Sequence, residues 1–212
     1  MNKRILFLLP LIALIACSPS KNGESLNPPS SDDSTSSDSL DPELYGTKTV
    51  TFKGDSSRTG MTQGSQLGDE KFNTAVTSLF NEDDAGFLTN LSGASCSFQP
   101  VYDTSVTSLT VGTGSKAGNI IFSFSKEIVK LDFVLQTYHK YIEYSHSYSF
   151  DADAEITVEG QHYDMSIASL DNPPENKNES LTLESPKNSI EFSNSEAAHR
   201  VYIHSITFTY KK

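Results

Sequence analysis

The run RVYIHSITFTY, residues 200–210, decides the fold class of this chain. Aromatic and β-branched residues dominate it and alternate with polar residues in the period of two that marks a half-buried β-strand. The main series runs on one parity from Tyr202 to Tyr210, whereas Val201 and Ile203 lie on the other. The run therefore predicts a strand that either buries both faces at its start or changes phase through a β-bulge near residues 204–205.

Shorter runs with the same alternation recur along the chain. Turn residues separate them, and the crossover helices that a parallel sheet needs do not lie between them. We therefore predict a mainly β fold, an antiparallel β-sandwich of jelly-roll type. The other predicted strands cover residues 47–52, 106–111, 119–125, 129–135, 156–158, 163–167, 181–183 and 190–192.

One short amphipathic helix is predicted over residues 69–80. The spacing of Phe72, Val76, Leu79 and Phe80 places all four on one helical face. Two acidic residues open the run, where the helix macrodipole favours negative charge. We expect this helix to cover one end of the sheet.

Composition divides the 212 residues into three segments. Residues 1–16 combine a cationic start with a short apolar run, which is the anatomy of a signal peptide. Residues 17–44 are rich in Ser, Asp and Pro and too poor in apolar side chains to offset the entropy of folding, so we expect a disordered stalk. Residues 45–212 form the predicted β-sandwich domain.

The end of the apolar run, Leu14-Ile15-Ala16-Cys17, resembles the lipobox of bacterial lipoproteins. The resemblance implies cleavage before Cys17 and lipidation of its sulfur, which would anchor the protein at the extracytoplasmic face of the cell membrane. The alternative is an ordinary secretory signal in which a cysteine falls near the cleavage site by chance. The apolar run itself is too short for a permanent membrane span.

The second cysteine and the net charge limit the remaining chemistry. If Cys17 is lipidated, Cys96 has no disulfide partner, and we expect a small buried side chain there. The formal net charge is -11, and the sequence contains no basic patch. Such a chain repels phosphate backbones, so nucleic acid is excluded as a partner.

A second resemblance rests on residues 113–124, 138–141 and 200–210. These runs look like the C-terminal β-sandwich modules of secreted and lipid-anchored Firmicutes-type proteins, which are mostly uncharacterised. The jelly-roll architecture of those modules is similar to that of galactose-binding-like and carbohydrate-binding modules. The resemblance implies a non-catalytic binding role by analogy of fold alone.

The sequence contains no complete catalytic motif. Residues 112–118 are glycine-rich, but their spacing differs from that of phosphate-binding loops and no helical run follows them, so we predict a hairpin turn. The histidines show no HExxH pair, and the serines no nucleophile elbow. A pair of carboxylates for glycoside hydrolysis could be formed only by the fold.

Three alternating carboxylates, Asp151, Asp153 and Glu155, are the weak candidates for a metal site. With oxygen ligands from a distant loop they would suit a structural calcium ion. The alternative is an acidic sheet edge in solvent. We predict no other cofactor.

Aromatic residues concentrate in residues 137–150, which hold Tyr138, Tyr141, Tyr144, His146 and Tyr148. One interpretation is an aromatic, hydrogen-bonding platform for a sugar ring or a protein partner. The other is a set of ordinary cross-strand residues, since tyrosine is favoured in strands. The absence of tryptophan argues against strong carbohydrate binding.

Together these patterns favour a lipid-anchored, extracytoplasmic protein whose β-sandwich binds glycan or protein without catalysis. The alternative is an envelope-associated hydrolase that acts on polysaccharide. The two hypotheses differ in whether two carboxylates converge in a cleft.

The resemblance at residues 14–17 predicts the mature N-terminus. We expect mass spectrometry of the protein isolated from membranes to find Cys17 as the first residue, carrying the mass of its acyl chains. An unmodified Cys17 would refute the lipid anchor.

Overall fold

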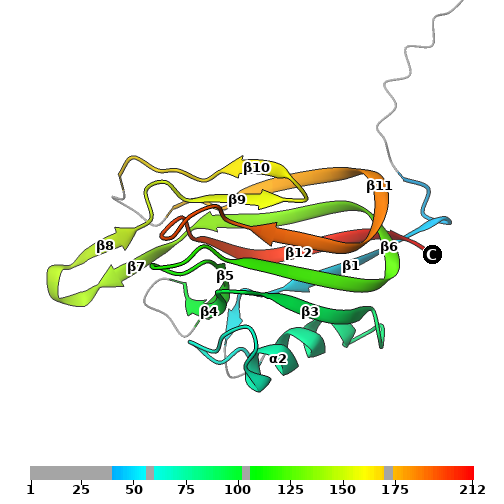
Figure 1. Ribbon diagram of the computed structural model, residues 1–212, viewed down its shortest axis with the longest axis horizontal. Helices are drawn as coiled ribbons and strands as arrows, with labels where there is room; N and C mark the ends of the chain where they lie inside the picture. The colour runs from blue at the N-terminus through cyan, green and yellow to red at the C-terminus, as the bar shows by residue number, and fades with distance from the viewer. Residues whose placement is uncertain (1–39, 56–59, 102–105, 170–173) are drawn as a thin grey trace, which may run out of the picture. The chain divides into compact units, whose positions relative to one another are not determined.

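The computed structural model describes residues 40–212 apart from 56–59, 102–105 and 170–173 (Figure 1). The resemblance at residues 14–17 and most of the predicted stalk lie outside these ranges. The described part is mainly β and contains one α-helix, α2 (Glu70–Asn81), and one short 3-10 helix, η1 (Glu143–Ser145). Neither of these two helices is long and apolar enough to cross a membrane.

Ten of the described strands form one sheet, and every pairing in it is antiparallel. The remaining two form a separate hairpin, β7 (His139–Ile142) and β8 (Ser147–Phe150). The strands of the large sheet are β1 (Tyr45–Thr51), β2 (Gly54–Asp55), β3 (Leu88–Ala94), β4 (Cys96–Pro100), β5 (Val106–Val111), β6 (Asn119–Thr137), β9 (Glu155–Val158), β10 (Gln161–Asp164), β11 (Lys177–Ser193) and β12 (Val201–Lys211).

The sheet folds into two layers because its longest strands continue from one layer into the other (Figure 1). The first half of β6 pairs with β3, and its second half pairs with β12. The long strand β11 follows both halves of β6. One layer therefore contains β3, β9 and β10, and the other contains β12, β1, β5, β4 and β2. This arrangement is the predicted antiparallel β-sandwich.

Phenylalanine rings fill the space between the layers. Phe124 of β6 and Phe208 of β12 lie with their ring centroids 4.8 Å apart. Helix α2 inserts Phe80, whose ring centroid is 5.0 Å from that of Phe122 and 5.6 Å from that of Phe208. Because Phe80 contacts rings from both layers, the helix seals the side on which the sandwich would otherwise be open.

The helix predicted over residues 69–80 is confirmed. Its apolar face is fully buried at Phe72 and Val76 and partly buried at Leu79. The side-chain amide of Asn81, the last helical residue, bonds both backbone groups of the first residue of β3 at 2.9 and 3.4 Å. The helix is therefore attached to one layer by hydrogen bonds and to both by its rings.

Both alternatives for residues 200–210 hold in β12. Val201 and Ile203 belong to the main core, whereas Tyr202 and His204, 0% and 3% exposed, are buried on the opposite face. The register with β6 then shifts between Ile203 and the residue after His204. This β-bulge changes the phase, so that the later apolar residues up to Phe208 face the main core.

The predicted phase of residues 129–135 is wrong at its start. The alternation placed Val129 on the same face as Leu131, but the structure fully buries Ile128 instead. The pairing of β6 with β12 shifts register between Ile128 and Lys130. The alternation in the sequence does not reveal this second irregularity, because Ile128 and Val129 are both apolar and either could face the core.

The hairpin predicted at residues 112–118 is also wrong. A tight turn is present, with the Thr113 N–H donating to the Lys116 carbonyl at 2.8 Å. However, the flanking strands do not pair with each other: β5 pairs with β12, β4 and β2, and β6 pairs with β11, β12 and β3. The segment is instead a crossing loop that carries the chain from one layer to the other.

Asn194, which is 6% exposed, holds this crossing loop in place. Its side-chain oxygen accepts the Gly118 N–H at 2.6 Å, and its amide nitrogen donates to the carbonyls of Glu196 and His199 at 3.1 and 3.2 Å. The loop is closely packed, since a Cβ on Gly118 would lie 2.4 Å from the backbone nitrogen of Gly112. Glycine is therefore required at position 118.

Cys96 is a small buried side chain, as predicted, and is not part of a disulfide. Its sulfur lies 3.3 Å from the carbonyl oxygen of Asn119. Burial raises the pKa of the Cys96 thiol to about 12, so the thiol is uncharged at neutral pH.

The contacts of Asn194 predict a loss of stability in Asn194→Ala. The substitution leaves the buried Gly118 N–H without its acceptor, which costs about 1–3 kcal/mol of the free energy of unfolding. Urea denaturation would measure this loss. The control is Asn178→Ala at an exposed position of β11, for which we expect a change within about 0.5 kcal/mol. Equal stability of the two variants would contradict the role of Asn194.

Candidate functional site

The aromatic cluster predicted from residues 137–150 lies on and beneath the β7–β8 hairpin, which projects from the sandwich (Figure 1). The hairpin follows directly from the end of β6, and the 3-10 helix η1 connects its strands. His146, just after η1, has a positive φ of 48°, which completes the reversal of the chain. This local geometry sets Tyr141 opposite Tyr148 in the register.

Tyr141, Tyr148 and His146 come together on the hairpin, and we call these three residues the tyrosine face. The two tyrosine ring centroids lie 5.2 Å apart at an interplanar angle of 54°. The Tyr141 hydroxyl lies 3.1 Å from Nδ1 of His146. Tyr144, in η1, is 90% exposed. The tyrosine face thus combines apolar ring surface with hydroxyl and imidazole groups.

Tyr138 does not join the tyrosine face. It is only 7% exposed, and its ring packs against Tyr202 at a centroid distance of 5.2 Å. The guanidinium of Arg200 covers the same ring at 3.6 Å. Asp151 fixes that guanidinium through hydrogen bonds of 2.7 and 2.9 Å. Tyr138 therefore stabilises the base of the hairpin through stacking and a cation–π contact.

Buried polar groups complete the base of the hairpin. The Tyr202 hydroxyl lies 2.6 Å from the Pro100 carbonyl and 3.0 Å from that of His139, the first residue of β7. Burial raises the pKa of Tyr202. Burial also lowers the pKa of His139, whose ring Nδ1 lies 3.0 Å from the carbonyl oxygen of Thr137. These contacts fix the point at which the chain leaves the sandwich.

His204 forms a buried polar chain with Ser108 and Gln136, which sequence reasoning missed. Nδ1 of His204 lies 2.9 Å from the Ser108 hydroxyl, and Nε2 lies 2.9 Å from the Gln136 side-chain oxygen. Burial, with smaller contributions from the charges of Lys53 and His139, lowers the pKa of His204 to about 3. Ser108 is 0% exposed, so no substrate carbonyl can reach its hydroxyl. The chain of hydrogen bonds satisfies buried groups and is not a nucleophile site.

The structure does not bring Asp151, Asp153 and Glu155 together as a metal site. Both oxygens of Asp151 bind Arg200, and Asp153 is exposed. Glu155 accepts hydrogen bonds from the hydroxyl and N–H of Ser195, which lower its pKa. Within residues 40–212 as described, no group of three or more His, Cys, Asp or Glu side chains is placed to hold a metal ion.

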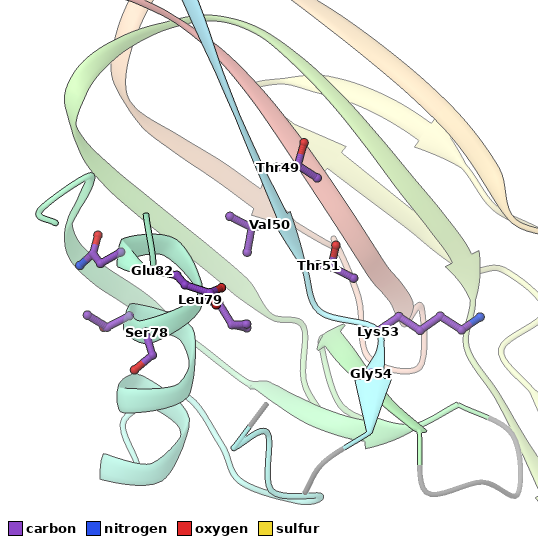
Figure 2. Close-up of a pocket in the computed structure, with 10 residues that line it drawn as sticks. Thr49, Val50, Thr51, Lys53, Gly54, Ser78, Leu79 and Glu82 are labelled. Atoms are coloured by element: carbon purple, nitrogen blue, oxygen red, sulfur yellow. The ribbon is translucent and has the colours of Figure 1, made fainter. Parts of the chain in front are cut away.

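A groove of about 760 Å³ lies between β1 and α2 (Figure 2). Sequence reasoning missed this groove, because its two walls come from elements that are separate in the sequence. Hydroxyl groups of threonine and serine make up much of the lining, with Lys53 and Glu82 as the charged groups. The lining residues are Thr49, Val50, Thr51, Lys53, Gly54, Thr77, Ser78, Leu79, Asn81 and Glu82.

No protein-family model and no curated protein matches the chain. Among solved structures it is similar to a family 29 carbohydrate-binding module, with 11% identity, a TM-score of 0.39 and coverage of 78% of this chain and 88% of that one. A variant of such a module in complex with mannohexaose gives 8% identity and a TM-score of 0.37, covering 77% and 92%.

The catalytic unit of an α-1,3-glucanase from Streptomyces thermodiastaticus gives 9% identity and a TM-score of 0.30. The match covers 78% of this chain but 26% of that one. The similarity to the carbohydrate-binding modules is therefore distant and extends over most of the chain. At such low identities and TM-scores it assigns neither a family nor a ligand.

The burial of His204 predicts a pH dependence of stability. The unfolded chain binds a proton at His204 below the ordinary pKa of 6.5, whereas the folded protein resists protonation down to about 3. Stability from this group is therefore full above pH 6.5 and is lost as the pH falls toward 3. The loss between pH 7 and pH 5 is about 2 kcal/mol.

Urea denaturation of the wild type and of His204→Gln at pH 7 and pH 5 would test this dependence. We expect the variant to be less stable at pH 7 but to lose less stability on acidification. His146→Gln, at an exposed position, controls for the removal of a histidine as such. Parallel losses in the wild type and His204→Gln would contradict the assignment.

Proposed function

We propose that this protein is a non-catalytic glycan-binding module that binds through the tyrosine face. The supporting observation is the pairing of Tyr141 and Tyr148 on a projecting hairpin, with His146 beside them. Aromatic rings pack against the apolar faces of sugar rings, while hydroxyl and imidazole groups bond the sugar hydroxyls. Tyr141 and Tyr148 are partly exposed, and the neighbouring Tyr144 is 90% exposed, so aromatic surface on the hairpin is accessible to a ligand.

The base of the hairpin supports this proposal by making the site rigid. Tyr138, Arg200 and Asp151 are locked together by stacking and by two charge-assisted hydrogen bonds. The buried hydroxyl of Tyr202 contacts the backbone at the start of β7. A site that is held in place before binding loses less entropy when the ligand arrives.

We further propose that Cys17 carries a lipid and anchors the protein at the extracytoplasmic face of the cell membrane. The support is the lipobox-like run at residues 14–17 and the Ser/Asp/Pro-rich composition of residues 17–44. A glycan-binding module on such a tether would hold polysaccharide at the cell surface.

Calorimetric titration with soluble oligosaccharides tests the glycan proposal. The panel contains mannohexaose, the ligand named for one of the similar structures, and β-1,4-glucan, xylan and α-1,3-glucan oligomers. We expect at least one to bind, and Tyr148→Ala and Tyr141→Ala each to weaken it about tenfold, which corresponds to about 1.4 kcal/mol.

The matched control is Tyr45→Ala. Tyr45 pairs with Lys211 at the end of β12 opposite to the hairpin, so its loss should leave glycan affinity unchanged. Near-ultraviolet circular dichroism checks that each variant keeps its fold. Absence of any binder in the panel, or equal affinities of all the variants and the wild type, would overturn the proposal.

A further inference from the structure

In the part of the chain that the structure describes, the outer edge of β1 has no strand partner. All seven residues of β1 pair with β12 in a continuous register, and no other described strand pairs with β1. The edge of β4 shows the contrast, because residues 64–67 cover it: the Gly64 N–H donates to the Phe98 carbonyl at 2.8 Å and the Leu67 N–H to that of Cys96 at 2.9 Å. An open edge offers a row of backbone donors and acceptors to another chain.

The groove between β1 and α2 runs along this edge. Its lining includes Thr49, Val50 and Thr51, which are consecutive and therefore point to alternate faces of the sheet. A groove that is lined by residues of both parities lies along the backbone edge rather than over one face of the strand. Ser78 and Leu79 of α2 form the opposite wall (Figure 2). The volume of about 760 Å³ lies within the range of ligand sites.

Along residues 49–51, which line this groove, β1 has few of the devices that normally protect an edge strand. β1 contains no proline, its register shows no bulge, and its threonines favour an extended chain. Its internal lysine, Lys48, precedes the residues that line the groove: the side chain is 10% exposed, and its ammonium lies 3.5 Å from the carboxylate of Asp83. The backbone of β1 therefore remains accessible.

The lining of the groove includes one residue of each charge. Lys53 lies at the carboxyl end of β1, and Glu82 lies at the carboxyl end of α2. The last turn of α2 contains no basic residue, so the negative end of the helix dipole adds to the charge of Glu82. The ion pair between Lys48 and Asp83 places this acidic end of α2 near the middle of β1, on the amino-terminal side of Thr49.

We propose that the groove binds an extended segment of another protein, which adds to β1 as an antiparallel strand. The charges fix the sequence character of this segment. Its amino-terminal end lies beside Lys53 and is acidic, and its carboxyl-terminal end lies beside Glu82 and is basic. This activity is separate from glycan binding, because the groove and the tyrosine face share no residues.

A peptide array on the framework Glu-x-Val-x-Val-x-Lys, with x any residue except proline, provides the probes. We expect the best array peptide to bind the mature protein, as measured by fluorescence anisotropy. Reversal of its terminal charges should weaken binding about tenfold, since like charges would then meet at both ends. N-methylation of alternate residues along the edge that faces β1 should abolish binding, because it removes backbone donors and keeps every side chain.

Two variants of α2 localise the binding. Ser78→Trp fills the groove and should weaken the peptide at least about tenfold. Thr74→Trp is the matched control on the same helix, at an exposed position outside this groove, and should leave affinity unchanged.

Three results would overturn the proposal. The first is an array without binders, and the second is equal binding of the N-methylated peptide. The third is a concentration-dependent dimer that Ser78→Trp abolishes, which would assign the edge to a second copy of this chain. Glycan titration of Ser78→Trp separates this test from that of the tyrosine face, since the variant should bind glycan normally.

Discussion

The β-bulge at His204 is the constraint on which the rest of the structure depends. Before it, β12 directs Val201 and Ile203 into the main core and leaves the opposite face to Tyr202 and His204. Because that second face is also apolar and aromatic, another part of the chain must cover it. The segment around Tyr138 provides the cover, and the β7–β8 hairpin begins there. The bulge thus couples the packing of the sandwich to the position of its projecting hairpin.

This coupling places the polar groups of Tyr202 and His204 in the interior, where hydrogen bonds compensate for the loss of water. A buried imidazole or hydroxyl without a hydrogen bond costs about 1–3 kcal/mol. The His204 ring contacts Ser108 on one side and Gln136 on the other, and the Gln136 amide in turn donates to the Pro174 carbonyl. Each hydrogen bond adds little net stability, but together they disfavour any other packing of this face.

Sequence alone predicted the features that depend on local periodicity. The alternation in β12 and the helical spacing of α2 identified the main core, because burial of one face imposes a period on the sequence. Features that depend on distant partners were not predictable. Residues 112–118 cross between layers because the strands on either side of them pair with β12 and β11 and not with each other. Val129 lies out of phase because the register of β6 shifts against β12.

The tyrosines show the same limit at the candidate site. Tyr138 and Tyr141 look alike in sequence, yet Tyr138 is covered by Arg200, more than sixty residues away, and Tyr141 lies on the hairpin. The groove was equally invisible, since an open strand edge becomes a site only through its position beside α2.

The register of β12 shows how far the start of β1 lies from the tyrosine face. The chain enters the sheet at Tyr45, which pairs with Lys211, the last residue of β12. Val201, the first residue of β12, pairs with Thr137 just before the hairpin. Ten residues of extended chain between these two pairs span roughly 33 Å. The tyrosine face therefore lies toward the end of the sandwich opposite to Tyr45, the first residue of β1.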